Sequence, residues 1–281
     1  MNRRETQTLL NQYGLKPTRS LGQNFLVDER AVATLLDAAA LSADDQVIEI
    51  GPGAGSITRR LAEQAGRVIA VEIDEKLRPI LETISREHDN LQLVWADARQ
   101  TSLTSLAQHW PGTTVVYANL PYYITTELVE QLICQLPQSR QLLLMMQKET
   151  ADRFLSPPGT RQYGPTSILI ALHGSASRLI TLSPAAFWPQ PNVDSIVLQL
   201  QKKVGATLWS EQADKRSQFL RFLNNCFQQR RKQLKNNLSY LGQETLAALF
   251  ETAGLQPTVR AEQVTPEQYV QLFERLLTRS T

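Results

Sequence analysis

The amino-acid sequence predicts an α/β fold, in which a doubly wound parallel sheet is followed by a smaller helical region. Short apolar runs alternate with helical segments between Asp28 and Met146, which is the βαβ pattern. The glycine-rich turn Gly51-Pro-Gly-Ala-Gly55 joins one such run to a helix. From Glu211 onward, apolar residues recur at the spacing of an amphipathic helix instead.

The elements of the sheet region are expected in the following order. Asp28 predicts the N-cap of an amphipathic helix that ends near Leu41. Five apolar strands are then expected, at residues 46–50, 67–72, 91–95, 114–118 and 141–146. We expect the helices between them at about 56–64, from the capping residue Asp74 to about Ser85, and from near Thr125. Two further strand-like stretches follow at 178–182 and 195–201.

The C-terminal region is predicted to form a separate helical domain. Its apolar face consists of residues at helical spacing, namely Phe219, Phe222, Leu223, Cys226, Phe227, Leu234, Leu238 and Leu241. The stretch 202–205 is the expected linker. We therefore predict an α/β domain over residues 1–203 and a helical domain over residues 204–281.

Composition and charge narrow the class of protein. Hydrophobic residues make up 42% and charged residues 20% of the 281, as in an ordinary soluble globular protein. No apolar stretch reaches the ~18 residues of a membrane span, and no secretory signal is visible, so we expect a cytoplasmic protein. Cys134 and Cys226 match no metal or redox spacing, and the histidines are scattered, so no metal is expected.

Charge is unevenly distributed along the chain. Residues 31–100 contain 12 acidic and 7 basic side chains, whereas residues 215–235 contain seven basic and no acidic ones. A basic region beside an acidic one indicates a polyanionic partner held next to a neutral or cationic ligand. A pair of solvated charged faces is the alternative interpretation.

Three motifs at successive strand ends indicate a nucleoside-containing cofactor. Gly51, Gly53 and Gly55 allow the backbone to turn sharply close to a ligand, although Ser56 stands where a dinucleotide fingerprint has its third glycine. Glu72 ends the next strand, where a carboxylate accepts bonds from both ribose hydroxyls, and Asp97 follows the third strand, where its carboxylate suits an adenine amine. An adenosine without a pyrophosphate fits best, which favours S-adenosylmethionine over NAD.

Each of these features also has a structural interpretation. The glycines alone form a tight turn, Glu72 alone suits a helix N-terminus, and Asp97 alone is a turn former. Their order along one edge of a sheet favours the binding interpretation. Glu49, inside the first strand, is expected either to face the methionyl ammonium of that cofactor or to orient the loop.

The fourth strand ends in Asn119-Leu-Pro-Tyr122, which suits chemistry on an adenine N6 amine. The side-chain oxygen of Asn119 and the backbone carbonyl of Leu120 can accept its two hydrogens, and Pro121 keeps Leu120 extended. Tyr122 offers a stacking face for the base. Phe187 is a candidate for the other side of the base pocket, although aromatic residues in such positions are usually core. A strand-ending turn with a core tyrosine is the structural alternative.

Taken together, these motifs resemble those of the KsgA-type small-subunit ribosomal RNA adenine-N6,N6-dimethyltransferases, and the resemblance extends over nearly the whole sequence. The motifs that carry the resemblance are Arg19-Ser-Leu-Gly-Gln-Asn-Phe-Leu26, Glu49-Ile-Gly-Pro-Gly53, Asn119-Leu-Pro-Tyr122, Gln147-Lys-Glu149, Phe187-Trp-Pro-Gln-Pro-Asn-Val-Asp-Ser195 and Phe227-Gln-Gln-Arg-Arg-Lys-Gln-Leu234. The resemblance implies a class I (Rossmann-like) S-adenosylmethionine-dependent methyltransferase sheet with a small C-terminal all-helical domain.

The same resemblance implies the roles of particular residues. Asn24 and Leu26 would belong to a lid segment that touches the cofactor, which is also bound by Gly51, Gly53, Glu72, Asp97 and Asn119. The implied substrate is a pair of adjacent adenosines in a hairpin loop near the 3′ end of 16S rRNA, each methylated twice. Two positions depart from the family pattern: Ala96 replaces a glycine, and Thr126-Glu127 stands where proline is common.

A basic stretch is the expected RNA contact. Arg230, Arg231, Lys232 and Lys235 are predicted to lie on one helix, where they bind RNA or pair with acids of the first domain. Three rival functions remain open: a DNA adenine methyltransferase, a 23S rRNA adenine dimethyltransferase, and a non-catalytic or dual-role ribosome assembly factor. A monomer is expected.

Overall fold

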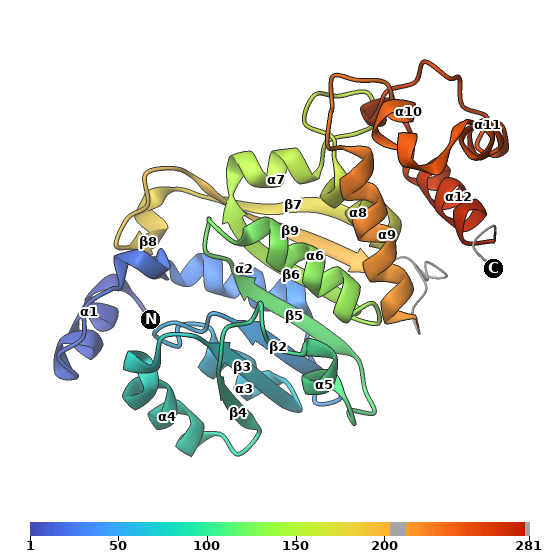
Figure 1. Cartoon of the computed structure of the whole chain (residues 1–281). Helices are drawn as coiled ribbons and strands as arrows, with labels where there is room; N and C mark the ends of the chain where they lie inside the picture. Colours follow the sequence, from blue (N-terminus) through green and yellow to red (C-terminus); the bar gives the residue numbers. More distant parts are fainter. Residues whose placement is uncertain (203–211, 279–281) are drawn as a thin grey trace. The chain divides into compact units, whose positions relative to one another are not determined.

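The computed structural model describes residues 1–202 and 212–278, which form two compact units (Figure 1). The first unit consists of Met1–Ala151 together with Ala176–Lys202. The second consists of Asp152–Ser175 together with the described C-terminal residues. This division differs from the predicted boundary at 203/204, because residues 152–175 pack with the C-terminal helices. The predicted linker, apart from Lys202, lies outside the described residues.

A seven-stranded sheet forms the centre of the first unit, in the order β4-β3-β2-β5-β6-β9-β7. The strands are β2 (Gln46–Ile50), β3 (Arg67–Glu72), β4 (Leu91–Trp95), β5 (Thr114–Asn119), β6 (Gln141–Gln147), β7 (Gly174–Leu182) and β9 (Ser195–Lys202). The pairs from β4 to β6 are parallel, and β9 runs antiparallel to β6. The predicted α/β class and the positions of all five predicted parallel strands are therefore confirmed.

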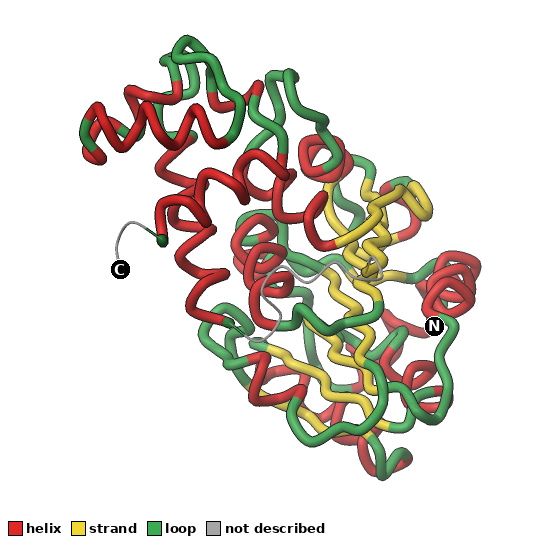
Figure 2. Tube along the Cα trace, turned by 90° about the vertical axis from the view of Figure 1, so that its right-hand side faces the viewer, coloured by secondary structure: helices red, strands yellow, loops and turns green. Residues whose placement is uncertain are grey.

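This strand order creates a crevice at the carboxyl ends of β2 and β5. The chain runs outward from β2 to β3 and β4, then returns to the other side of β2 with β5 and β6. Loops leaving β2 and β5 therefore diverge, and ligands of doubly wound sheets bind at such a switch point. Figure 2 shows the strands of this unit with helices alongside them.

Helices flank the sheet of the first unit. They are α1 (Arg3–Gln12), α2 (Glu29–Ala39), α3 (Thr58–Gln64), α4 (Arg78–Glu87), α5 (Leu103–Ala107) and α6 (Thr125–Gln135). Of these, α2, α3 and α4 pack directly against β6, β3 and β4. The predicted cap of α2 is confirmed, since Asp28 Oδ1 accepts the backbone N–H groups of Arg30 and Ala31 at 2.9 and 3.1 Å. Asp74 caps the short 3-10 turn η2 (Glu75–Leu77), and α4 follows that turn instead of starting at Asp74.

A two-stranded sheet that was not predicted joins the N-terminal segment to the loop before β9. β1 (Phe25–Leu26) pairs antiparallel with β8 (Phe187–Trp188). The rings of Phe25 and Trp188 stack with centroids 6.4 Å apart, and the N–H of Val27 donates to the carbonyl of Ala186 at 2.8 Å. The motifs at residues 19–26 and 187–195, which are far apart in the sequence, are therefore in contact.

The second unit is helical, and aromatic side chains fill its core. It contains α8 (Pro165–His173), α9 (Ala213–Cys226), α10 (Leu234–Asn237), α11 (Gln243–Thr252) and α12 (Pro266–Leu277). The rings of Phe219, Phe222 and Phe273 lie within 6.5 Å of one another. The hydroxyl of Tyr163 donates to the carbonyl of Val264 at 3.0 Å, which ties residues 152–175 to the C-terminal helices.

The prediction of one helix carrying all four basic residues is wrong. α9 ends at Cys226, residues 227–232 form turns, and only Lys235 lies on a helix, the short α10. The side chain of Asn237 explains this end, because it donates to the carbonyl of Cys226 at 2.6 Å and accepts the N–H of Gln229 at 3.0 Å. These bonds satisfy backbone groups that a continued helix would otherwise pair.

Candidate functional site

The loop after β2 approaches its neighbours so closely that glycine is required. Gly51, Gly53 and Gly55 have φ values of 73°, 59° and 77°. A Cβ on Gly51 would lie 3.0 Å from the backbone oxygen of Asn119, and one on Gly53 would lie 3.0 Å from the ring of Phe25. The absence of side chains at Gly51 and Gly53 therefore lets the loop pack closely against the end of β5 and against β1.

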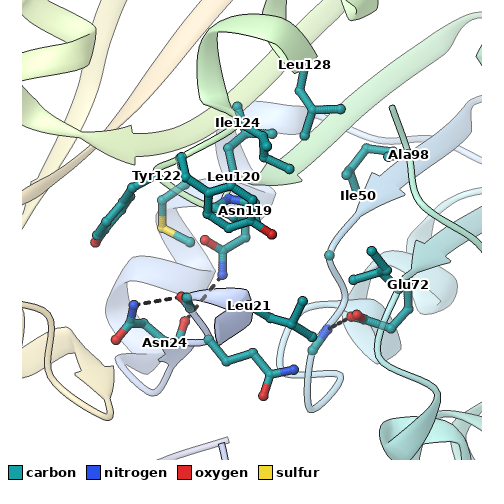
Figure 3. A pocket seen from close by; sticks show the side chains of 18 of the residues that line it. Leu21, Asn24, Ile50, Glu72, Ala98, Asn119, Leu120, Tyr122, Ile124 and Leu128 are labelled. Carbon is teal, nitrogen blue, oxygen red and sulfur yellow. Dashed lines mark hydrogen bonds between the residues drawn. The ribbon is translucent and has the colours of Figure 1, made fainter. Parts of the chain in front are cut away.

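Glu72, the last residue of β3, presents an oriented carboxylate to this loop. Its Oε2 accepts the N–H of Gly53 at 3.1 Å (Figure 3). Its Oε1 accepts the N–H of Asp74 at 2.8 Å. The side chain is only 6% exposed, and burial raises its pKa. A carboxylate has about four acceptor positions, so two remain for hydroxyl donors of a ligand.

Asp97, which follows β4, lies in the site but is already bound to a neighbour. Its carboxylate accepts from Nε and Nη2 of Arg99, the latter at 2.6 Å, and from the backbone N–H of Arg99 at 2.9 Å. These bonds lower the pKa of Asp97. An adenine amine would share this carboxylate with Arg99, a residue that the sequence analysis did not select.

Glu49 is completely buried inside β2. Neither of its carboxylate oxygens has a hydrogen-bond partner among the described residues. Burial raises its pKa to about 8, the nearby Thr58 hydroxyl acts in the opposite direction, and the charge of Glu72 raises the pKa further. Its neighbour across the parallel pair is Tyr117 of β5, whose pKa burial also raises. At neutral pH Glu49 is therefore mostly protonated.

The end of β5 presents one oriented acceptor and one aromatic face. The Nδ2 of Asn119 donates to the carbonyl of Asn24 at 3.4 Å, which leaves the Oδ1 of Asn119 as the free end of its amide (Figure 3). Leu120 N–H donates to the carbonyl of Met145 at 3.0 Å, so the β5–β6 pairing continues into the motif. The hydroxyl of Tyr122 lies 3.3 Å from that of Ser195.

A single pocket brings together most of the residues that the sequence analysis selected. It is lined by Asn24, Gly51, Gly53, Glu72, Asp97, Asn119, Leu120, Tyr122 and Phe187. Leu26 instead lines an adjoining hollow with Gly51, Gly53 and Asn119. Phe187 is 2% exposed, so its side chain belongs mostly to the core although it contributes to the pocket lining.

The pocket also has lining residues that the sequence analysis missed. Ile73 is 45% and Tyr123 is 59% exposed, although apolar and aromatic side chains are usually buried. Each directly follows a selected residue, Glu72 or Tyr122, and that adjacency is the signal by which they could have been found. Among the described residues, no group of three or more metal-ligating side chains occurs, and no helix is long and apolar enough to cross a bilayer.

The basic residues of the second unit differ in what they contact. The guanidinium of Arg230 donates to the backbone carbonyls of Arg161 and Tyr163 and lies 5.4 Å from the centre of the Phe227 ring. Arg231, Lys232 and Lys235 are exposed. Arg230 therefore holds this unit together, by pairing with backbone carbonyls of its own unit.

Comparison with known proteins identifies relatives along nearly the whole chain. The family model described as ribosomal RNA adenine dimethylase matches residues 14–278. A protein of Latilactobacillus sakei named ribosomal RNA small subunit methyltransferase A is 37% identical, over 98% of this chain and 95% of its own. One of the same name from Clostridium botulinum is 35% identical, over 96% of this chain and 97% of its own.

Two solved structures share the fold. A dimethyladenosine transferase from Plasmodium falciparum superposes with a TM-score of 0.71 at 22% identity, over 91% of this chain and 98% of its own. The 23S rRNA methyltransferase ErmE superposes with a TM-score of 0.62 at 26% identity, over 90% of this chain and 99% of its own.

Proposed function

The chain belongs to the ribosomal RNA adenine dimethylase family, and from this premise we propose that it dimethylates the N6 amines of two adjacent adenosines in 16S rRNA. The adenosines lie in a hairpin loop near the 3′ end, and the methyl groups come from S-adenosylmethionine. The observation that carries the proposal is the single pocket that joins a ribose-type carboxylate, Glu72, to an amine-accepting motif, Asn119–Tyr122. The named relatives favour the small subunit over 23S rRNA.

Glu72 and the glycine loop form the cofactor half of the pocket. The two remaining acceptor positions of Glu72 suit the two ribose hydroxyls, and the Gly53 N–H fixes the direction of the carboxylate. Asp97 and its partner Arg99 line the neighbouring part of the pocket, where an adenine amine would be bound. Because glycines have no side chain, the backbone of the loop 51–55 can lie directly against the methionyl part of S-adenosylmethionine.

The residues after β5 hold the reacting amine. Asn119 Oδ1 and the carbonyl of Leu120 accept its two hydrogens, which directs the nitrogen lone pair away from the ring. Tyr122 stacks on the base, and Phe187 contributes to the pocket wall. The sulfonium of the cofactor supplies an already activated methyl group, so these residues need only align the amine with it.

The RNA partner is proposed to lie partly on the second unit. Arg231, Lys232 and Lys235 are exposed cations in a stretch without acidic residues, which suits phosphate binding. Arg230 supports them through its bonds to the carbonyls of Arg161 and Tyr163. We further infer a monomer that works in the cytoplasm, where small ribosomal subunits are assembled.

Transfer of tritiated methyl groups tests the proposal directly. Three substrates are compared: undermethylated 30S subunits, 50S subunits and plasmid DNA. We expect label in the 30S subunits alone, recovered as N6,N6-dimethyladenosine after nuclease digestion. Label in 50S subunits or DNA would favour one of the rival methyltransferases. Binding to 30S subunits without label would favour a non-catalytic assembly factor.

A further inference from the structure

The carboxylate of Asp74 anchors the N-terminal segment 18–24 to the loop that follows β3. Its Oδ2 accepts the Thr18 hydroxyl at 2.9 Å and the Nε2 of Gln23 at 2.7 Å. The side-chain oxygen of Gln23 accepts the backbone N–H of Thr18 at 2.7 Å, so Thr18, Gln23 and Asp74 form a closed ring of hydrogen bonds. Asp74 is 7% exposed, so these charge-assisted bonds are largely shielded from water.

The two oxygens of Asp74 serve different purposes. Oδ1 accepts the N–H of Lys76 at 3.2 Å, which caps the η2 turn. Among the described residues, Oδ2 accepts only from the segment, whose donors lie 51 and 56 positions earlier in the chain. A residue needed only to form the local turn would require Oδ1 alone. The second oxygen therefore indicates a role beyond the turn.

The segment joins both halves of the pocket. At one end, Asp74 also donates its backbone N–H to Oε1 of Glu72 at 2.8 Å. At the other end, the carbonyl of Asn24 accepts from Asn119 at 3.4 Å, and Leu21 between them lines the pocket (Figure 3). Segment 18–24 thus crosses from the carboxyl end of β3 to that of β5.

We propose that Asp74 is a positioning residue that holds segment 18–24 across the pocket and so retains the bound cofactor. The nature of that ligand rests on the proposed function; the anchoring itself does not. Release of the ligand then requires the two bonds at Oδ2 to break. Because Gln23 anchors the segment only through Asp74, removing both side chains has little more effect than removing Asp74 alone.

Two measurements test the anchor. The first is the rate at which S-adenosylhomocysteine dissociates from the full chain, followed by stopped-flow displacement. The second is the rate of tryptic cleavage after Arg19, an exposed residue within the segment, followed by mass spectrometry. The variants are Gln23→Ala, Asp74→Ala, the double variant and Asp74→Asn. Asp89→Ala, which removes an exposed carboxylate in the turn after α4, is the matched control.

We expect Gln23→Ala and Asp74→Ala each to speed dissociation about tenfold, the size of effect typical for a hydrogen bond to a charged group. Cleavage after Arg19 accelerates in both, and the double variant resembles Asp74→Ala. Asp74→Asn keeps an acceptor oxygen and stays closer to the parent protein. In methyl transfer, KM for the donor rises while kcat at saturation changes little.

Gln23→Ala keeps the anchor testable even if Asp74→Ala fails to fold, because Gln23 contributes nothing to the η2 cap. Gln23 also lines the pocket, so cleavage after Arg19, measured without ligand, separates the anchor from a direct contact with the ligand. Unchanged dissociation and cleavage in Gln23→Ala, at an unaltered melting temperature, would overturn the proposal. So would additive effects in the double variant. A chain that holds S-adenosylhomocysteine but methylates no 30S subunits contradicts the proposed function and leaves the anchor standing.

Discussion

Replacing the buried Glu49 with glutamine is expected to stabilise the protein, and to do so only at high pH. The folded chain holds a proton on Glu49 up to about pH 8, whereas the unfolded chain releases it near the ordinary value of 4.5. Between these values the folded state binds more protons, so the free energy of unfolding falls as pH rises. Glutamine has nearly the same shape, cannot ionise, and removes this dependence.

The magnitude follows from the separation of the two pKa values. A shift from 4.5 to about 8 corresponds to a ceiling of roughly 5 kcal/mol at ~1.36 kcal/mol per pKa unit. Relaxation around a charged Glu49 reduces this, so we expect Glu49→Gln to gain on the order of 3 kcal/mol at high pH. Below about pH 4.5, where both states are protonated, the two proteins should differ little.

Urea unfolding across a pH series measures the effect. Tryptophan fluorescence reports mainly on the first unit, which contains three of the four tryptophans, Trp95, Trp110 and Trp188. The control is Glu251→Gln, on the exposed side of α11, where no burial penalty exists to remove. A stability gain for Glu49→Gln that is the same at pH 5 and pH 9 would refute the argument, since the benefit would then not arise from ionisation.

The remaining predictions concern the proposed function. Glu72→Ala should weaken S-adenosylhomocysteine binding by about 1.5–3 kcal/mol in calorimetry, because charged hydrogen bonds are lost; unchanged affinity would contradict the ribose role. Asn119→Ala should strongly depress methyl transfer, whereas Tyr122→Phe should be mild because the ring face remains; equal damage from Tyr122→Phe and Tyr122→Ala would show that the hydroxyl matters. Replacing Arg231 and Lys235 with glutamine should lower the log–log salt slope of 30S binding by roughly 0.7–0.9 per contact and leave the melting temperature unchanged. A lowered melting temperature with an unaltered slope would mean that these side chains are structural.

The parts of the fold that the sequence predicted are those with local causes. Each parallel strand is an apolar run bounded by turn residues, and Asp28 caps α2 through its own neighbours. The positions of Gly51 and Glu72 followed in the same way, because the carboxyl ends of adjacent parallel strands meet at one edge.

The parts that were missed depend on distant partners. The strands β1 and β8 have two residues each, too few for any periodicity, and their pairing joins residues about 160 positions apart. The end of α9 depends on Asn237, eleven residues beyond the carbonyl that it caps. The bond between Arg99 and Asp97 was missed for a different reason: Arg99 is only two residues away, but the sequence does not specify the direction of its side chain.

The helical unit is built from two separate stretches of the chain, and this affects how it folds during synthesis. The α8 helix packs against α9 and α12, yet it leaves the ribosome long before either of them. Translation proceeds at roughly 5–20 residues per second. The apolar side chains of Ile168 and Leu169 are therefore synthesised several seconds before the helices that bury them. A chain stopped at residue 202 would keep α8 without those partners, so neither unit can be obtained by a single cut. Exchange of the helical unit between homologues therefore requires transplanting two separate stretches of the gene.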